Sequence, residues 1–391
     1  MRSLLLRSWA VQGASASVLL VQNALVPAVI GAESYGRAVS LVVLPLLLQG
    51  MIEPMANGVA IAASGRDDHD QWIAYAGKHL RFMAPIVVGA CTVFALQRGG
   101  TTVEVLLVAG FATLALVNTV ARAFAFAHLR LGIIVGHYLA ALAGTFLTIP
   151  FLHPMGALGF LAMLCVVQLA VLAVLLHDGL IRKSSLIALR AATTRNKITL
   201  RSTYLGNLAA RLAQLALGPG ILLLASLQLG AAQLAEFRLC QTLLGMLVYL
   251  APGNATVIQA LGRGAALDER KPRRRHAAGL LLISFAITTV GAGVVWLVYP
   301  LAMYFILDIQ DATGSIRWLT MFGPFYVMTP LLAAYLLGGG EERFVLVFSL
   351  GVTLIVAAIS WTAGVATAFM VGTMVFFIGY GLAARRLVAR P

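Results

Sequence analysis

The sequence predicts an all-α polytopic membrane protein of about 12 transmembrane helices, arranged as two parallel six-helix lobes. Composition is the first reason. Of 391 residues, 60% are hydrophobic and 11% are charged, and the mean hydropathy is +0.93, which is far above the range of soluble globular domains. Recurrence is the second reason, because apolar stretches of about 20 residues, the length that crosses a bilayer core, follow one another along the chain. No separate water-soluble domain is expected.

Charges, Gly/Pro clusters and polar runs separate the predicted spans. The first stretch begins like a signal peptide, but Gln12, Ser15 and Ser17 interrupt it and it continues too long, so we interpret it as an uncleaved span. The predicted spans are 9–30, 35–63, 82–98, 102–122, 131–151, 156–176, 203–226, 232–262, 277–299, 316–337, 343–362 and 365–384.

The basic residues predict the orientation. The net charge is +14, and most lysines and arginines fall in connections on one side of the predicted membrane. Because cytoplasmic loops are enriched in Lys and Arg, both termini are expected in the cytoplasm. The run from Arg270 to Arg275 is explained as a topology signal with some attraction for anionic membrane lipid. Since the charge is spread over short loops, nucleic acid is not an expected partner.

The longest cytoplasmic connection, 177–204, divides the chain into predicted lobes of residues 1–190 and 191–391. The two halves match weakly but in the same order. Because six crossings restore the starting side, such repeats are parallel, and transporters built in this way bind substrate between their halves. The matched positions are Gly31 with Gly230, Pro54 with Pro252, Asn57 with Asn254, and Gly156 with Gly364.

Polar side chains inside spans are costly, so they are the first candidates for function. Several recur at helical spacing and share one helix face. Hydrogen bonding between helices is the structural alternative for the amides and hydroxyls. The stripes are Gln49, Glu53 and Asn57; Asn118 and Arg122; Asn207, Arg211 and Gln214; and Gln12, Ser15 and Gln22.

Five charged residues carry the strongest signal. Glu53 and Arg211 lie deep in their spans, where an unpaired charge costs about 2.5–3.5 kcal/mol on insertion scales. They are expected either to serve the function or to form a structural ion pair with each other. Arg37 and Arg238, placed early in the second and eighth spans, either reach outward to water or occupy equivalent functional positions of the repeat. Glu236 either supplies a counter-charge or faces the periplasm.

Metal and nucleotide chemistry is not expected. The seven histidines lack the spacing of a zinc helix, and Cys91, Cys165 and Cys240 lie in apolar stretches without metal-ligand or redox spacing. No Walker loop is present in the sequence, so direct drive by ATP is not expected.

Three segments resemble a known family. Residues 29–62 contain a turn of Gly31, Tyr35 and Gly36 that leads into a long helix, and residues 299–325 and 364–377 resemble the ninth-to-tenth connection and the last span of polysaccharide exporters. These belong to the oligosaccharide-lipid flippase branch of the multidrug, oligosaccharidyl-lipid and polysaccharide exporter superfamily, whose plan is MATE-like. The first predicted span carries no arginine, unlike that of lipid II flippases, which favours a polysaccharide repeat unit over a peptidoglycan precursor.

The resemblance implies a flippase of the bacterial inner membrane rather than an enzyme. It would move an undecaprenyl-pyrophosphate-linked oligosaccharide between leaflets by alternating access, without a cofactor, driven by a proton or sodium gradient or by the membrane potential. A polysaccharide polymerase or chain-length regulator would be its partner. Cationic groups suit a pyrophosphate and amides suit sugar hydroxyls. The candidate binding residues are Arg211, Arg238, Arg37, Asn207, Gln214 and Asn57, with Glu53 and Glu236 for coupling or counter-charge.

Two alternatives remain open. A multidrug antiporter of the same superfamily would need an acidic cavity for cationic drugs, and the intramembrane arginines argue against one. A polytopic polymerase or glycosyltransferase would need a sizeable outer loop, whereas the longest such loop carries only Asp308, Asp311 and Arg317.

Overall fold

The computed structural model describes residues 13–64, 69–127, 131–177, 211–251, 270–309 and 314–389, together with positions 208 and 258. Almost all of these residues are helical, and the described ranges contain no β-strand. The chain divides into two compact units, residues 1–207 and 208–391. The boundary predicted between residues 190 and 191 lies outside the described residues.

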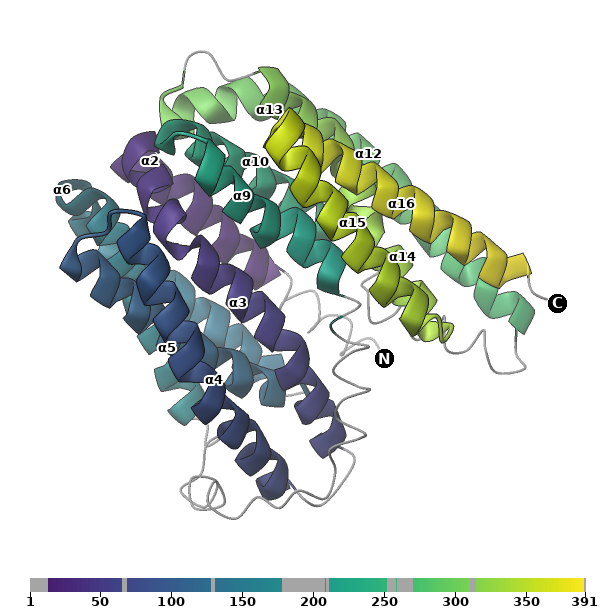
Figure 1. Ribbon diagram of the computed structural model, residues 1–391, viewed down its shortest axis with the longest axis horizontal. Coiled ribbons are helices and arrows are strands. Elements are labelled where there is room, and N and C mark those ends of the chain that lie inside the picture. Colours follow the sequence, from purple (N-terminus) through teal and green to yellow (C-terminus); the bar gives the residue numbers. More distant parts are fainter. Residues whose placement is uncertain are drawn as a thin grey trace. The chain divides into compact units, whose positions relative to one another are not determined.

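Unit 1 consists of the long helices expected for the first six spans (Figure 1). Helix α6 covers both the fifth and sixth predicted spans, because two helices continue through a break at Gly156. The elements are η1 (Val21–Leu25), α2 (Val26–Ile30), α3 (Ala32–Ser64), α4 (His69–Gln97), α5 (Thr102–Ala127) and α6 (Leu131–His177).

Unit 2 supplies helices for the remaining spans. Over the described residues of both units, nine helical stretches are long and apolar enough to cross a membrane. The stretch in α6 covers two of the predicted spans, the fifth and the sixth. The elements are η2 (Ala216–Gly220), α9 (Ile221–Gln228), α10 (Ala231–Leu250), α12 (Arg270–Leu307), α13 (Gly314–Leu319), η3 (Thr320–Phe322), α14 (Gly323–Gly338), α15 (Glu342–Ala363) and α16 (Val365–Ala389).

The predicted eighth span is interrupted after Leu250, where helix α10 ends. Of the remainder of that span, which was predicted to reach residue 262, only Ala251 and the helical position 258 are described. Ala251 is extended, with ψ of 121°. It precedes Pro252, and the proline ring disfavours the helical conformation of the residue before it. Helix α12 runs from Arg270 to Leu307, well beyond the predicted 277–299.

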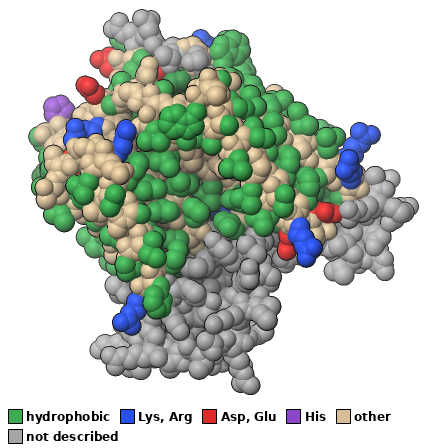
Figure 2. Space-filling view, viewed as in Figure 1, with side chains coloured by type: hydrophobic (Ala, Val, Ile, Leu, Met, Phe, Trp, Pro, Cys, Tyr) green, Lys and Arg blue, Asp and Glu red, His purple; other side chains and the backbone are tan. Residues whose placement is uncertain are grey.

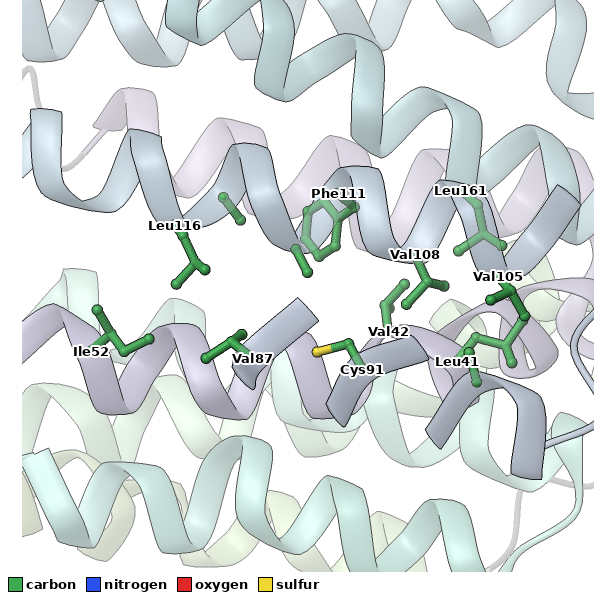
Figure 3. Close-up of a cluster of buried hydrophobic side chains, with 13 residues drawn as sticks. Leu41, Val42, Ile52, Val87, Cys91, Val105, Val108, Phe111, Leu116 and Leu161 are labelled. Atoms are coloured by element: carbon green, nitrogen blue, oxygen red, sulfur yellow. The ribbon is translucent and has the colours of Figure 1, made fainter. Parts of the chain in front are cut away.

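The core of unit 1 is an apolar cluster where α3, α4, α5 and α6 meet (Figure 3). Leu41 and Val42 of α3 pack with Val108 and Phe111 of α5, while Leu161 closes the cluster from α6. All five are at most 2% exposed. Since this packing holds α3 beside α5 along their length, polar groups that the two helices share have fixed positions.

Two matched glycines have the same backbone role. Gly156 has φ of 52° and Gly364 has φ of 86°, a region that L-residues with side chains rarely adopt. Each lies immediately before the sixth helix of its unit, where the chain reverses. This shared geometry is what the weak repeat in the sequence predicts.

The outer surface fits a hydrocarbon environment. Large apolar side chains are strongly exposed on several helices, among them Leu147 at 72%, Phe305 at 73% and Leu354 at 72%. Apolar side chains cover much of the face shown in Figure 2, and charged groups are sparse there. Such a surface would be unfavourable in water, which agrees with the membrane spans.

Replacing Gly156 tests the break in α6. In Gly156→Ala a side chain is forced into positive φ, at a cost of about 1–3 kcal/mol, and its Cβ would lie 3.1 Å from Ser34 Oγ. We expect a lower midpoint of thermal unfolding in detergent. Gly89→Ala in α4 is the control, because its added Cβ has no neighbour within 4 Å. Equal midpoints for the two variants would contradict the strained break.

Candidate functional site

Arg37 forms a close ion pair at the N-terminal end of α3. Its Nη2 lies 3.0 Å from Glu104 Oε2 and its Nε donates to Glu104 Oε1 at 3.2 Å. The Glu104 side chain is 6% exposed and the Arg37 side chain 51%. Two parallel N–H···O bonds are the strong geometry for an arginine and a carboxylate. This predicted substrate-binding arginine is therefore held by a neighbouring helix of its own unit.

Glu104 also starts helix α5, a role that our sequence interpretation missed. Its Oε2 accepts from Thr101 N at 2.8 Å, and Thr101 Oγ1 accepts from Glu104 N at 3.3 Å. This reciprocal arrangement is a capping box, with the sequence signature Ser/Thr-x-x-Glu. The letters TTVE at 101–104 carry that signature, so the cap was detectable. Its partnership with Arg37, 67 positions away, was not.

A second polar region lies further along α3 and α5, and we call it the α3/α5 seam: Gln49, Glu53, Thr119 and Arg122. Gln49 Nε2 donates to Thr119 Oγ1 at 3.1 Å. Glu53 Oε1 lies 3.9 Å from Arg122 Nη2. The seam thus brings together two stripes predicted on separate spans. Glu53, expected to pair with Arg211 or to serve the function, contacts Arg122 within unit 1.

Two further polar groups border the seam from α5 and α6. Asn118 Nδ2 donates to Gln168 Oε1 at 2.7 Å and to the Gln168 carbonyl at 2.8 Å, but its Oδ1 is buried without a hydrogen-bond partner. His137 is 7% exposed, its Nδ1 likewise lacks a partner, and the charge of Arg122 acts on it. His137 was not among the predicted site residues.

In unit 2, Glu236 is buried, with 2% exposure. Its Oε1 accepts a hydrogen bond from Tyr299 Oη at 2.7 Å, between α10 and α12. The charge of Arg317, whose guanidinium lies 4.0 Å above the Trp296 ring, also acts on Tyr299. A buried carboxylate normally needs such donors. Glu236 therefore does not simply face the periplasm, which was one of the two readings of the sequence.

The remaining candidates of unit 2 are partly buried. Arg211 and Gln214 lie three positions apart at the start of the described seventh span, on one helix face. Arg238 lies in α10, and its charge acts on the hydroxyl of Tyr326 in α14. Asn207 lies outside the described residues. Asn57 belongs to α3 of unit 1, but its side chain is likewise outside the description.

The helix boundaries change one expected equivalence. Helix α3 begins after Gly31 and α10 begins after Gly230. Counting from these matched glycines, the position that corresponds to Arg37 is Glu236, whereas Arg238 is shifted by two residues and points elsewhere on the helix surface. The expected equivalence of Arg37 and Arg238 is therefore corrected. The corresponding positions carry opposite charges, each bound by a residue of a neighbouring helix.

These arrangements favour recognition of a charged or polar ligand. The described residues contain no group of three or more His, Cys, Asp or Glu side chains that could hold a metal ion. Arginines occur inside both units, and those of the seam and of the seventh span are only partly buried. Guanidinium groups in a low-dielectric setting bind phosphate or carboxylate strongly.

Glu104→Gln tests the close pair. The substitution keeps the shape but removes the charge that Arg37 and the α5 N-terminus share. Because Arg37 is half exposed and solvent screens it, we expect a loss of about 1 kcal/mol, measured as a lower midpoint of thermal unfolding. Glu342→Gln, an exposed residue in the first turn of α15, is the matched control. An unchanged midpoint for Glu104→Gln would show that the pair contributes nothing to stability.

Comparison with known proteins gives a match in structure alone. No family model and no curated protein sequence matches the chain. An inward-facing multidrug resistance MATE family transporter of the MOP superfamily superposes with a TM-score of 0.65 at 16% identity, covering 95% of each chain. A MOP superfamily transporter from Pyrococcus furiosus, described as having a binding pocket of reverse polarity, gives 0.62 at 16% identity over 97% of this chain and 95% of that one.

The lipid II flippase MurJ, in an inward closed conformation, gives a TM-score of 0.64 at 10% identity, over 97% of this chain and 87% of that one. At these identities the likeness concerns the fold. It extends over nearly the whole chain and includes both a drug transporter and a lipid-linked flippase. The chain thus has the fold shared by MATE family transporters and MurJ, as the sequence predicted.

Proposed function

We propose that this protein is a transporter that moves an undecaprenyl-pyrophosphate-linked oligosaccharide, a polysaccharide repeat unit, across the bacterial inner membrane by alternating access. The observation that carries the proposal is the whole-chain likeness to MATE family transporters and to the flippase MurJ. Transport needs two arrangements of the same helices around one site. The division of the chain into two compact units is compatible with such a transport cycle.

The charges inside the spans support an anionic cargo. The buried carboxylates are already engaged, Glu104 by Arg37 and Glu236 by Tyr299. Arg211 and Arg122 are partly exposed. Partly exposed arginines suit a pyrophosphate, while the amide of Gln214, on the same helix face as Arg211, suits sugar hydroxyls. In this proposal the lipid tail stays in the bilayer, and Arg238 contributes positive potential rather than the main contacts, while Arg37 is held by Glu104.

A multidrug antiporter is the second candidate, because MATE family transporters share the fold. It would require carboxylates open to a cationic drug. Glu53 is the partly exposed carboxylate of the α3/α5 seam, and Arg122 lies beside it. The positive charges of unit 1 and unit 2 therefore favour the anionic cargo.

The setting of the transporter completes the proposal. The distribution of basic loops supports a cytoplasmic position for both termini. No cofactor is needed, since a charged cargo responds to the membrane potential or to a coupled proton or sodium gradient. A polysaccharide polymerase or chain-length regulator would receive the cargo. No bond is made or broken in this cycle, so the protein is proposed as a transporter and not an enzyme.

Reconstituted vesicles test transport against catalysis. Purified protein should move a fluorescent undecaprenyl-pyrophosphate-linked oligosaccharide to the opposite leaflet, as measured by its accessibility to a membrane-impermeant quencher, without changing its mass. Fluorescent phosphatidylcholine in the same vesicles is the control and should stay in its leaflet. A changed cargo mass would support the enzyme alternative. Movement of a cationic dye in place of the oligosaccharide would support the antiporter.

Arg211 is the residue whose replacement should affect transport most in unit 2. Arg211→Gln should insert and fold but lose at least about tenfold in flipping rate, since hydrogen bonds to a charged group contribute about 1.5–3 kcal/mol. Arg211→Lys should be partly active, because a lysine keeps the charge but loses the two-pronged contact. The control is Arg343→Gln, an exposed arginine of α15. Flipping by Arg211→Gln at the wild-type rate and equal abundance would remove Arg211 from the site.

A further inference from the structure

The ion pair of the α3/α5 seam differs in geometry from the pair of Arg37 and Glu104. Arg37 contacts Glu104 with two nitrogens, at 3.0 and 3.2 Å. Arg122 approaches Glu53 through a single closest contact of 3.9 Å. Charge-assisted hydrogen bonds between guanidinium and carboxylate groups are normally about 2.7–2.9 Å long. The Glu53 contact therefore compensates the charge of Arg122 without using the directional N–H donors of the guanidinium.

The surroundings of Arg122 combine access with a low dielectric. Its side chain is 21% exposed and that of Glu53 24%, so both can be reached from outside the unit. Two residues of the apolar cluster of unit 1 lie close by in the sequence (Figure 3). Ile52 directly precedes Glu53 in α3, and Leu116 lies six positions before Arg122 in α5. Electrostatic attraction is stronger beside such apolar packing than in water. An anion at Arg122 would gain from both properties.

Other polar atoms of the same region are unsatisfied. His137 Nδ1 and Asn118 Oδ1 are buried without hydrogen-bond partners, and they come from α6 and α5 respectively. Of the described elements packed against α6, α3 brings Glu53 and α5 brings Arg122 to this region, while η1 and α2 carry no charged residue. Buried polar atoms without partners are rare in structural regions and call for an explanation.

We propose that Arg122 is a binding site for a phosphoryl anion, and that Glu53 occupies the place of that anion while the site is empty of cargo. The phosphoryl group displaces the Glu53 carboxylate and takes the N–H donors that Glu53 leaves unused. Five N–H donors in a planar fork match a phosphate better than one distant carboxylate oxygen does. The inference rests on the proposed function, since it assigns the pyrophosphate of the cargo to a residue outside the predicted set.

The two roles of the pair predict opposite results for one substitution. If Glu53 competes with the anion, then Glu53→Gln should tighten anion binding by up to about fivefold, the range measured for exposed ion pairs. Arg122→Gln should weaken binding at least about tenfold, and Arg122→Lys less. If the pair were only structural, Glu53→Gln and Arg122→Gln would weaken anion binding to the same extent, because each leaves one charge uncompensated.

The charge exchange Glu53→Arg with Arg122→Glu separates the roles further. It retains an ion pair between α3 and α5 but reverses its polarity, so a structural pair would retain full flipping and binding. An anion site would lose them. Glu53→Gln, which keeps size and shape, provides the same distinction if the exchanged protein does not fold. Arg81→Gln is the control for loss of one positive charge, since Arg81 is an exposed residue of α4 in the same unit.

Binding is measured with two probes. The fluorescent lipid-linked oligosaccharide reports affinity in detergent and flipping in vesicles, and sodium pyrophosphate reports the anion alone through the thermal midpoint of the protein. We expect pyrophosphate to raise the midpoint of the wild type, more so that of Glu53→Gln, and not that of Arg122→Gln. Arg81→Gln should respond like the wild type. Vesicles containing phosphatidylglycerol distinguish a lipid headgroup from the cargo. If the site bound lipid headgroups, phosphatidylglycerol would saturate it in these vesicles and block the binding of both probes.

The outcomes separate this inference from the proposed function. If pyrophosphate stabilises the protein through Arg122 but the oligosaccharide is not flipped, then the anion site stands and the assigned cargo is wrong. If the oligosaccharide is flipped equally by the wild type, Arg122→Gln and the charge-exchanged protein, then transport stands and the anion site is overturned. Weaker binding in Glu53→Gln, to the extent seen in Arg122→Gln, would also overturn it.

Discussion

Every part of this fold depends on the requirement that backbone polar groups inside a membrane find partners within the protein. Continuous helices meet that requirement almost everywhere in the described residues. At two irregular points of the helices, a side chain donates to the backbone. At Gly218, whose φ and ψ of −99° and −105° interrupt the seventh span, Gln241 donates to the carbonyls of Leu217 and Gly218 at 3.2 Å each. In the π-helical η1, Asn23 donates to the Leu19 carbonyl at 2.8 Å.

The same requirement divides the intramembrane polar groups into two kinds. Asn23 is also the acceptor for Tyr35 Oη at 2.7 Å, and Tyr35 packs edge-on against Phe160, so this buried group is fully committed to structure. Arg37 and Glu104 are committed in a similar way. The Arg122 guanidinium, with its one long contact to Glu53, is not. Desolvated charges are costly unless they are well paired. An anionic ligand therefore gains the most interaction free energy at an incompletely paired arginine.

Local patterns predicted much of the fold but few of the contacts. The predicted spans have corresponding helices because hydrophobicity over about 20 residues is a local property. Helix α10 ends at Leu250, inside the predicted span, because Pro252 acts on the conformation of Ala251, a local effect that an apolar run conceals. Among the site residues, spacing placed Gln49 with Glu53 and Asn118 with Arg122 on common helix faces. Spacing gave no information about which face of α3 packs against which face of α5, and so the partnership of Glu53 with Arg122 was missed.

The sequence by itself determined the class of the protein, the succession of its spans and the glycines at which each sixth helix begins, because these follow from hydropathy and from backbone conformations that few residues can adopt. The tertiary structure decided how the charges are used. Arg37 is bound to Glu104, Glu236 to Tyr299 and Glu53 lies near Arg122. Such pairings depend on the rotation and register of packed helices, which arise from side-chain interlocking between segments distant in sequence.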